Sequence, residues 1–454
     1  MSGIILEGDV RIPYSAIVDT GNLEMLKQKY TVSSFFKGDF EMFSDDPESN
    51  YISFPRSVLS DIGASPVDNR SEGRALNKLC LFEPRDGQLD VVDRAVRSIE
   101  DNDSAMIVAG CGTGKTIMGT VVAMRTNRST CILVHKEFLA AQWEEAIHML
   151  CPDATIGRIQ SDRCDSGDDF DFVIAVTQSV TNPRREYPES VYRSFGLIVA
   201  DEVHRYGADV WHQAISRFPA KRRLALTATP HRMDGLWPVI EANFGPHQIE
   251  LKAKTLVPTI QVVTTNYSFQ LMKQKWLDDI HVRAKVVSKL CESEGRNEIV
   301  TRVAKKAFDA NKKILVISER RAQLDWIKER LGAYFIDDVG MYVGGKKMGS
   351  LDEAAEKQIV LTTYQMAKEG LNIPALEVLI MASPQTQIQQ TVGRVLREHK
   401  NKGKPVVIDF VDPAVEVLQK GVDGKIVSSQ PLQKMYFARQ RQYKKLGYDI
   451  AKRG

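Results

Sequence analysis

Short apolar runs followed by polar, helix-forming stretches recur in two series along the chain. The first series stands at residues 105–109, 131–134, 172–176, 197–200 and 224–226. The second series stands at residues 313–317, 358–361, 378–381 and 406–408. Apolar runs of this length, separated by crossover helices, are typical of parallel strands that are buried on both faces. The chain is therefore predicted to fold as two α/β domains with parallel sheets, joined near residues 245–260.

The two ends of the chain depart from this pattern. Residues 1–80 hold short alternating segments between clusters of Asp, Pro and Ser, which predicts a small accessory domain of mixed structure, a candidate for DNA binding. Residues 432–454 are expected to form a basic helical tail, since twelve Lys and Arg stand against five Asp and Glu from residue 400 onward. This segment either follows a duplex backbone or packs on the second domain.

Composition sets bounds on the class of protein. The chain has 454 residues, of which 43% are hydrophobic, so it can bury several cores. Its six cysteines lack the paired spacing of a zinc site or a disulfide framework. No run of about 18 apolar residues is present, and residues 1–14 lack the apolar stretch of a secretory signal. We therefore expect a soluble cytoplasmic protein with no membrane partner.

A glycine-rich segment joins the first predicted strand to a helix expected over residues 117–125. It reads Ala109-Gly-Cys-Gly-Thr-Gly-Lys-Thr116. Glycines in this context let backbone N–H groups curl around phosphate oxygens, and the helix N-terminus favours negative charge. The residues expected to bind nucleotide here are Gly110, Cys111, Gly112, Thr113, Gly114, Lys115 and Thr116. Lys115 would also supply a catalytic positive charge, and the Thr116 hydroxyl would bind Mg²⁺.

Two adjacent carboxylates follow another predicted strand. Asp201-Glu-Val-His204 comes directly after residues 197–200 and lies 85 residues beyond Thr116. Strand-end carboxylates of a parallel sheet face the phosphate loop, so Asp201 is expected to hold Mg²⁺. Glu202 would orient or deprotonate the attacking water. An Asp-Glu pair alone is common at solvated strand ends, but together with the glycine-rich loop it predicts an NTPase.

These two segments resemble motifs I and II of the superfamily 2 helicases, in the Asp-Glu-x-His variant. The resemblance implies two tandem RecA-like domains, over residues 81–250 and 251–431, which use ATP and Mg²⁺ and act on nucleic acid. Arg85 and Gln88 match the family's adenine-reading segment. Thr227-Ala-Thr-Pro230 resembles motif III, which couples hydrolysis to strand movement. The coupling residues implied are His204, Thr227 and Thr229.

Other segments resemble the motifs that contact nucleic acid and the γ-phosphate. Nucleic-acid contacts are implied for His135, Lys136, Gln142, Thr177 and Gln178 in the first domain and for Ser318, Thr362 and Thr363 in the second. Residues 369–374 resemble motif V and imply nucleotide contacts from Gly370 and Asn372. Gln390-Thr-Val-Gly-Arg-Val-Leu-Arg397 resembles motif VI, which implies a nucleotide contact from Gln390. Arg394 and Arg397 become the candidate arginine fingers, catalytic residues that reach the γ-phosphate.

The segment after motif III favours DNA as the partner. Residues 231–235 extend this motif in a way typical of DNA remodelling branches, and the chain most resembles phage-encoded branch-migration and recombination helicases. The resemblance implies a monomeric, ATP-dependent DNA helicase that acts on forked or branched DNA in the cytoplasm of a bacterial host. The alternatives are a double-stranded DNA translocase of a restriction or remodelling complex, an RNA helicase, and a nucleic-acid clamp that does not hydrolyse ATP.

Overall fold

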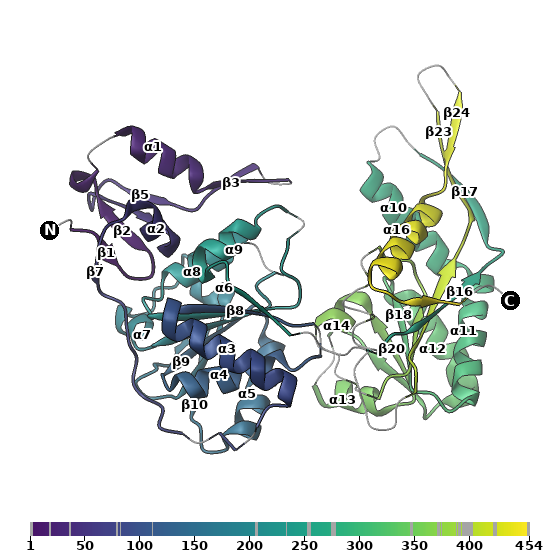
Figure 1. Ribbon diagram of the computed structural model, residues 1–454. Helices are drawn as coiled ribbons and strands as arrows, with labels where there is room; N and C mark the ends of the chain where they lie inside the picture. Colours follow the sequence, from purple (N-terminus) through teal and green to yellow (C-terminus); the bar gives the residue numbers. More distant parts are fainter. Residues whose placement is uncertain are drawn as a thin grey trace. The chain divides into compact units, whose positions relative to one another are not determined.

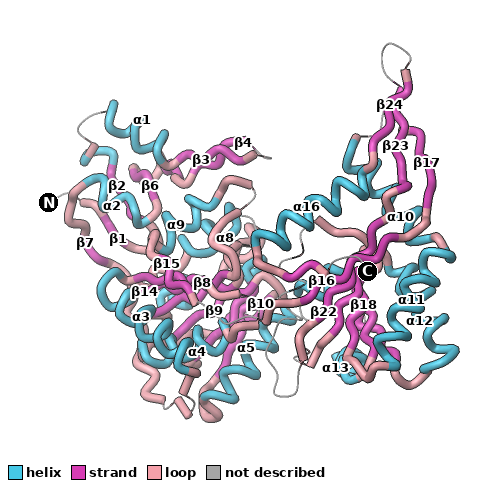
Figure 2. Tube along the Cα trace, turned by 45° about the vertical axis from the view of Figure 1, so that its right-hand side comes forward, coloured by secondary structure: helices cyan, strands magenta, loops and turns pink. Residues whose placement is uncertain are grey.

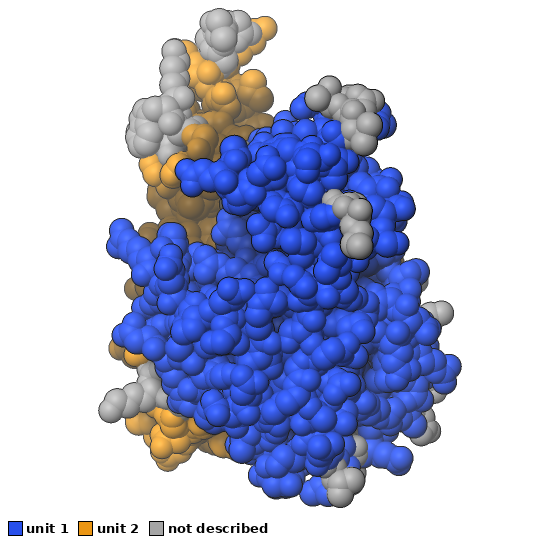
Figure 3. Space-filling model, turned by 90° about the vertical axis from the view of Figure 1, so that its left-hand side faces the viewer, with its two compact units in different colours: residues 1–253 blue, residues 254–454 orange. Residues whose placement is uncertain are grey.

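The computed structural model divides the chain into two compact units, Met1–Ala253 and Lys254–Gly454 (Figure 3). The division falls inside the predicted join. The structure describes residues 3–17, 20–35, 38–78, 80–81, 83–110, 112–204, 208–232, 234–251, 256–273, 278–345, 348–369, 373, 375–386, 388, 392, 403–420 and 425–451. No helix among these residues is long and apolar enough to cross a membrane.

An eight-stranded sheet forms the centre of the first unit (Figure 1). Its order is β11-β10-β12-β9-β13-β14-β8-β15, and only β11 pairs antiparallel to its neighbour. The five predicted strands are confirmed as β8 (Ser104–Val108), β9 (Thr130–Val134), β12 (Phe172–Val176), β13 (Leu197–Asp201) and β14 (Arg222–Thr227). The outer strands are β10 (Ile156–Gln160), β11 (Arg163–Cys164) and β15 (Gln248–Glu250).

Helices cover both faces of this sheet, as buried parallel strands require. One core packs the sheet against α3 (Asp86–Asn102), α4 (Lys115–Thr126) and α5 (Glu137–Leu150). The other packs it against α6 (Thr177–Val180), α7 (Glu189–Arg193), α8 (Ala208–Ser216) and α9 (Trp237–Phe244). Side chains from alternate positions of β8 enter opposite cores, with Ile107 on the first side and Met106 on the second.

The second unit is built on a seven-stranded parallel sheet, which confirms the predicted fold class of two parallel-sheet domains. Its order is β19-β20-β18-β21-β22-β16-β25. The four predicted strands are β18 (Ile314–Ser318), β20 (Ile359–Thr363), β21 (Val378–Met381) and β22 (Val406–Val411), joined by β16 (Thr259–Thr264), β19 (Val339–Tyr342) and β25 (Asp449–Ile450). Its helices include α10 (Asp279–Glu292), α11 (Glu294–Asp309), α12 (Arg321–Phe335), α13 (Met348–Glu356) and α14 (Tyr364–Glu369). A smaller sheet of β17 (Ser268–Met272), β23 (Ala414–Lys420) and β24 (Ile426–Ser429) completes the unit.

The basic C-terminal segment is a helix packed on the second unit, one of the two alternatives left open by the sequence. Helix α16 (Pro431–Lys445) carries Arg439 and Tyr443, both buried. The Arg439 guanidinium donates to the two carboxylate oxygens of Asp409 on β22 at 2.9 and 2.8 Å, and the Tyr443 hydroxyl donates to Asp409 at 3.0 Å. Strand β25 then pairs with β16. The segment therefore belongs to the core of its unit.

The N-terminal residues form a module of strands and short helices within the first unit (Figure 2). A sheet of β1 (Ile5–Leu6), β2 (Val10–Pro13), β5 (Ser44–Asp46), β6 (Tyr51–Phe54) and β7 (Val67–Asp68) carries helices α1 (Thr20–Lys29) and α2 (Leu59–Ile62) and a hairpin of β3 (Thr31–Ser34) and β4 (Gly38–Glu41). The module's core also takes in Leu236 and Val239, which belong to the RecA-like part of the unit. The two parts therefore share one hydrophobic core.

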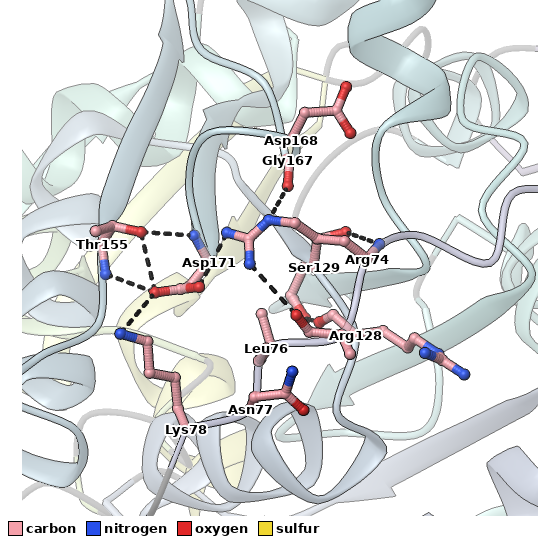
Figure 4. Close-up of polar contacts among 12 residues, drawn as sticks. Arg74, Leu76, Asn77, Lys78, Arg128, Ser129, Thr155, Gly167, Asp168 and Asp171 are labelled. Atoms are coloured by element: carbon pink, nitrogen blue, oxygen red, sulfur yellow. Dashed lines mark hydrogen bonds and ion pairs between the residues drawn. The ribbon is translucent and has the colours of Figure 1, made fainter.

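Residues 69–78 form a strap beside the residues that precede the first unit's parallel strands, with backbone hydrogen bonds from Ser71 to Pro219 and from Ser129 to Arg74. Figure 4 shows the part of this strap around Arg74 and Lys78. Arg74 on this strap donates to Asp171 at 2.9 Å and to the carbonyl oxygen of Gly167 at 2.9 Å. Lys78 lies 3.7 Å from the same Asp171 carboxylate. Gly196 allows the strap to approach the backbone just before β13, because a Cβ at this position would be 1.9 Å from the carbonyl oxygen of Glu72. The strap is thus hydrogen-bonded to the edge opposite the strand ends that carry the predicted motifs.

Replacing Gly196 by Ala should destabilise the first unit by about 1–3 kcal/mol, because the added methyl group meets backbone that has no room to shift. Gly332→Ala in α12 is the control: nothing lies within 4 Å of its Cβ position, and the change should stabilise its helix by about 0.5–1 kcal/mol. Urea unfolding followed by circular dichroism measures both. Equal shifts for the two variants would contradict the close approach of strap and sheet.

Candidate functional site

The glycine-rich loop lies between β8 and α4, which is the strand-to-helix turn that the sequence predicts. Gly112 and Gly114 adopt φ of 80° and 86°, in the left-handed region that favours glycine. The Gln88 side-chain amide donates to the carbonyl oxygen of Thr113 at 2.8 Å, and its own oxygen accepts from the backbone N–H of Arg85 at 3.2 Å. Gln88 therefore braces the loop, and its predicted contact with adenine stays a prediction.

The two predicted carboxylates lie at the end of β13, beside the loop. Glu202 is 3.3 Å from the Lys115 ammonium, and both side chains are largely buried. Asp201 accepts a hydrogen bond from the indole N–H of Trp143 at 3.0 Å. Burial, and secondly the neighbouring charge of Glu202, raise the pKa of Asp201 to about 6. The site thus places the buried Lys115 ammonium beside two adjacent carboxylates, and the pKa of one of them, Asp201, is raised.

The coupling residues predicted from the sequence meet in one chain of contacts. The Nδ1 atom of His204 lies 3.2 Å from Glu202 and 3.0 Å from the hydroxyl of Thr227. That hydroxyl donates to the carbonyl oxygen of Thr229 at 2.8 Å. The backbone N–H of Ala109, at the start of the glycine-rich loop, donates to the carbonyl oxygen of Thr227 at 2.9 Å. The structure therefore joins motifs I, II and III through short polar contacts.

Three of the predicted nucleic-acid residues form hydrogen bonds within the protein, two of them to the ends of neighbouring strands. Thr177 and Thr362 are buried, and their hydroxyls donate to the last residue of the neighbouring strand, Val134 at 2.9 Å and Tyr342 at 2.7 Å. The Ser318 hydroxyl, also buried, donates to Gln323 at 2.6 Å. These three hydroxyls are therefore hydrogen-bonded inside the protein.

The other predicted contacts divide between exposed, half-buried and undescribed positions. Gln178 is exposed and His135 is buried, while Lys136, Gln142 and Thr363 are half-buried. Their contacts with nucleic acid remain predictions. Six predicted site residues lie outside the described residues: Cys111, Gly370, Asn372, Gln390, Arg394 and Arg397.

Two residues of the site were missed by the sequence analysis. Trp143 stands on the apolar face of α5, where a tryptophan is expected to be a core residue, so nothing in the pattern indicated its bond to Asp201. Arg232 belongs to the extension after motif III, but its contacts are with motif II: its guanidinium donates to the carbonyl oxygens of His204 at 3.2 Å and Val203 at 3.4 Å.

Comparisons with known proteins agree with this geometry. Residues 81–232 match the family model described as type III restriction enzyme, res subunit. A protein of Acanthamoeba polyphaga mimivirus, named as an ATP-dependent RNA helicase, is 32% identical over 381 residues, covering 82% of this chain and 73% of that protein. A protein of Invertebrate iridescent virus 6, named as a helicase, is 24% identical over 424 residues, covering 88% and 89%. An HsdR subunit fragment of a type I restriction enzyme from Vibrio vulnificus has a similar fold, with a TM-score of 0.53 at 18% identity over 82% of this chain and 74% of that one.

The parallel sheet, the phosphate loop and the strand-end carboxylates define an ATP-hydrolysing enzyme of the P-loop class. With the relatives above, the assignment becomes more specific. The chain belongs to the superfamily 2 helicases.

Replacing Trp143 by Phe should lower the kcat of ATP hydrolysis by about tenfold, because Asp201 loses the donor that orients it, a bond to a charged group worth about 1.5–3 kcal/mol. Trp211→Phe is a matched control: Trp211 is equally buried, and its indole N–H has no hydrogen-bond partner among the described residues. A phosphate-release assay compares the two. A similar loss of kcat in both variants would show that the effect comes from packing.

Proposed function

We propose that this enzyme is an ATP-dependent DNA helicase that acts on forked or branched DNA and couples ATP hydrolysis to translocation. The observation that carries the proposal is the contact chain from Lys115 through Glu202 and His204 to Thr227. It gives the ATP site a direct physical connection to motif III. A clamp that binds ATP without hydrolysing it would have no use for a positioned carboxylate such as Glu202.

The phosphate loop and its lysine account for nucleotide binding. Backbone N–H groups of the loop and the N-terminus of α4 attract the phosphates. The phosphates then compete with Glu202 for the ammonium of Lys115, since a buried cation binds the better-placed anion. When the phosphates take the place of Glu202 as partner of Lys115, the Glu202 carboxylate still has His204 beside it. It is then placed to orient the water that attacks the γ-phosphate.

Mg²⁺ fits the donors at this position. The Asp201 carboxylate and the Thr116 hydroxyl are oxygen ligands, which this ion prefers. Asp201 directly precedes Glu202, whose carboxylate lies 3.3 Å from Lys115 of the phosphate loop. The ion would neutralise phosphate charge when bound. Arg394 and Arg397 are proposed to stabilise the charge that develops on the γ-phosphate, on the strength of the motif VI resemblance.

DNA and RNA are the two candidate partners. DNA is supported by residues 231–235, which extend motif III as in DNA remodelling branches, and by the restriction-enzyme description of the family model. RNA is supported by the name of the mimivirus relative. We favour DNA because Arg232 of this extension donates to the carbonyl oxygen of His204 in motif II, which makes the extension part of the ATP site. A double-stranded DNA translocase remains the alternative among DNA motors.

Forked DNA should stimulate ATP hydrolysis more than single-stranded RNA or an RNA duplex of the same sequence. The purified chain should also separate a DNA fork and a Holliday junction in an ATP-dependent way, followed by gel mobility. Stimulation by linear duplex without any strand separation would favour the translocase. Stronger stimulation and unwinding with RNA would replace the DNA proposal by the RNA helicase.

Replacing Arg397 by Ala should abolish nucleic-acid-stimulated ATP hydrolysis while ATP binding survives. Arginine fingers contribute on the order of 10³ to 10⁵ in rate in other phosphoryl-transfer enzymes. Turnover is measured by phosphate release, and binding by titration with a fluorescent ATP analogue. Unchanged turnover would remove Arg397 from the catalytic set.

A further inference from the structure

The N-terminal hairpin β3–β4 contacts the extension that follows motif III. The backbone N–H of Phe35, just after β3, donates to the carbonyl oxygen of Asp234 at 3.0 Å. The next residue, Gly235, has φ of +80°, and a Cβ there would lie 3.1 Å from the Phe35 ring and 3.3 Å from the carbonyl oxygen of Ser33. The hairpin therefore lies directly against this loop.

The same loop holds motif II through Arg232. The Arg232 guanidinium forms an ion pair with Asp234, with its Nε donating to Oδ1 at 3.0 Å and its NH2 to Oδ2 at 2.5 Å. Its remaining nitrogen, NH1, donates to the carbonyl oxygens of His204 and Val203. Only 7% of the Arg232 side chain is exposed. Because a guanidinium is a rigid, planar fork, fixing Asp234 also fixes the direction of the two bonds to motif II.

The N-terminal module anchors the loop on its other side as well. Leu236 and Val239, directly after the extension, are buried in the core of this module. Phe40 of β4 packs edge-on against His212 of α8, with ring centroids 6.1 Å apart. The segment between motif III and α9 is thus held by the module at both its hydrogen-bonded turn and its apolar end.

We propose that the β3–β4 hairpin controls ATP hydrolysis by holding Asp234 and Gly235, with Arg232 as the positioning residue for motif II. The path runs from Phe35 to Asp234, from Asp234 to Arg232, and from Arg232 to His204, which contacts Glu202. This assigns the N-terminal module a part in setting the rate of the motor. A change in the hairpin is expected to shift the position of Glu202 although the hairpin itself does not contact ATP.

Arg232→Gln should lower basal kcat by about tenfold, the loss expected when charge-assisted hydrogen bonds to a positioned group are removed. The KM for ATP and the affinity for a fluorescent ADP should stay within about twofold, since no phosphate contact is changed. Arg163→Gln is the matched control, because Arg163 pairs with Asp165 at the same spacing but on the edge strand β11. Its kcat should equal that of the wild type.

Phe35→Ala tests the hairpin itself. Phe35 is 77% exposed, so its truncation leaves the core of the module intact, and the exposed Met25 on α1 provides the control Met25→Ala. We expect Phe35→Ala to lower basal kcat about threefold with an unchanged melting temperature, as a weakened packing contact would, and Met25→Ala to have no effect. Wild-type kcat in either Phe35→Ala or Arg232→Gln overturns the proposal.

The assays are run without nucleic acid, so they do not depend on whether DNA or RNA is the partner. Failure of the fork experiment would remove the proposed substrate and leave this inference in place. A parallel fall of kcat and melting temperature in Arg232→Gln, reproduced by Asp234→Ala, would show that the loop has a structural role only and would also overturn it.

Discussion

The ion pair between Lys115 and Glu202 is the interaction on which the site depends. A lysine that is only 8% exposed needs a counter-charge, since an unpaired buried ammonium is costly. Glu202 supplies it from the end of β13, at a positive φ of 54° that β-branched residues would not tolerate. The two charges meet because β14 lies between β8 and β13 and pairs with both in parallel register. The sheet order therefore decides the chemistry.

The same strand ends give the proposed coupling of hydrolysis to motion a short physical path. Thr227 ends β14, the strand between the phosphate loop and the carboxylates, and it contacts both the loop, through the Ala109 N–H, and His204. A shift at Glu202 thus reaches motif III without crossing the hydrophobic cores. Beyond motif III the chain enters the core of the N-terminal module at Leu236. The module therefore directly adjoins the segment that follows motif III.

The sequence was sufficient for the buried strands and the ATP site because both have strong local signals. An unbroken apolar run and a glycine-rich turn leave few alternative structures. Strands β10 and β16 were missed because polar residues such as the half-buried Arg158 and the exposed Gln261 alternate with the apolar ones. Thr177 and Thr362 show a different limit: motif resemblance gives the neighbourhood of a residue, whereas the direction of its hydroxyl depends on the strand beside it.

The attachment of the N-terminal module was beyond sequence reasoning because two arginines carry it, of which Arg223 is buried and Arg56 is half-buried. Arg56 donates to the carbonyl oxygens of Glu7, Ala220 and Lys221, and Arg223 donates to those of Gly8 and Asn243. Burial lowers the pKa of Arg223 to about 10, still far above neutral pH. Arginine is normally expected at the surface, so no sequence pattern indicates that these two side chains bind backbone carbonyls inside the unit. Their carbonyl partners come from both the module and the RecA-like part, and the accessory module therefore moves with the ATP site.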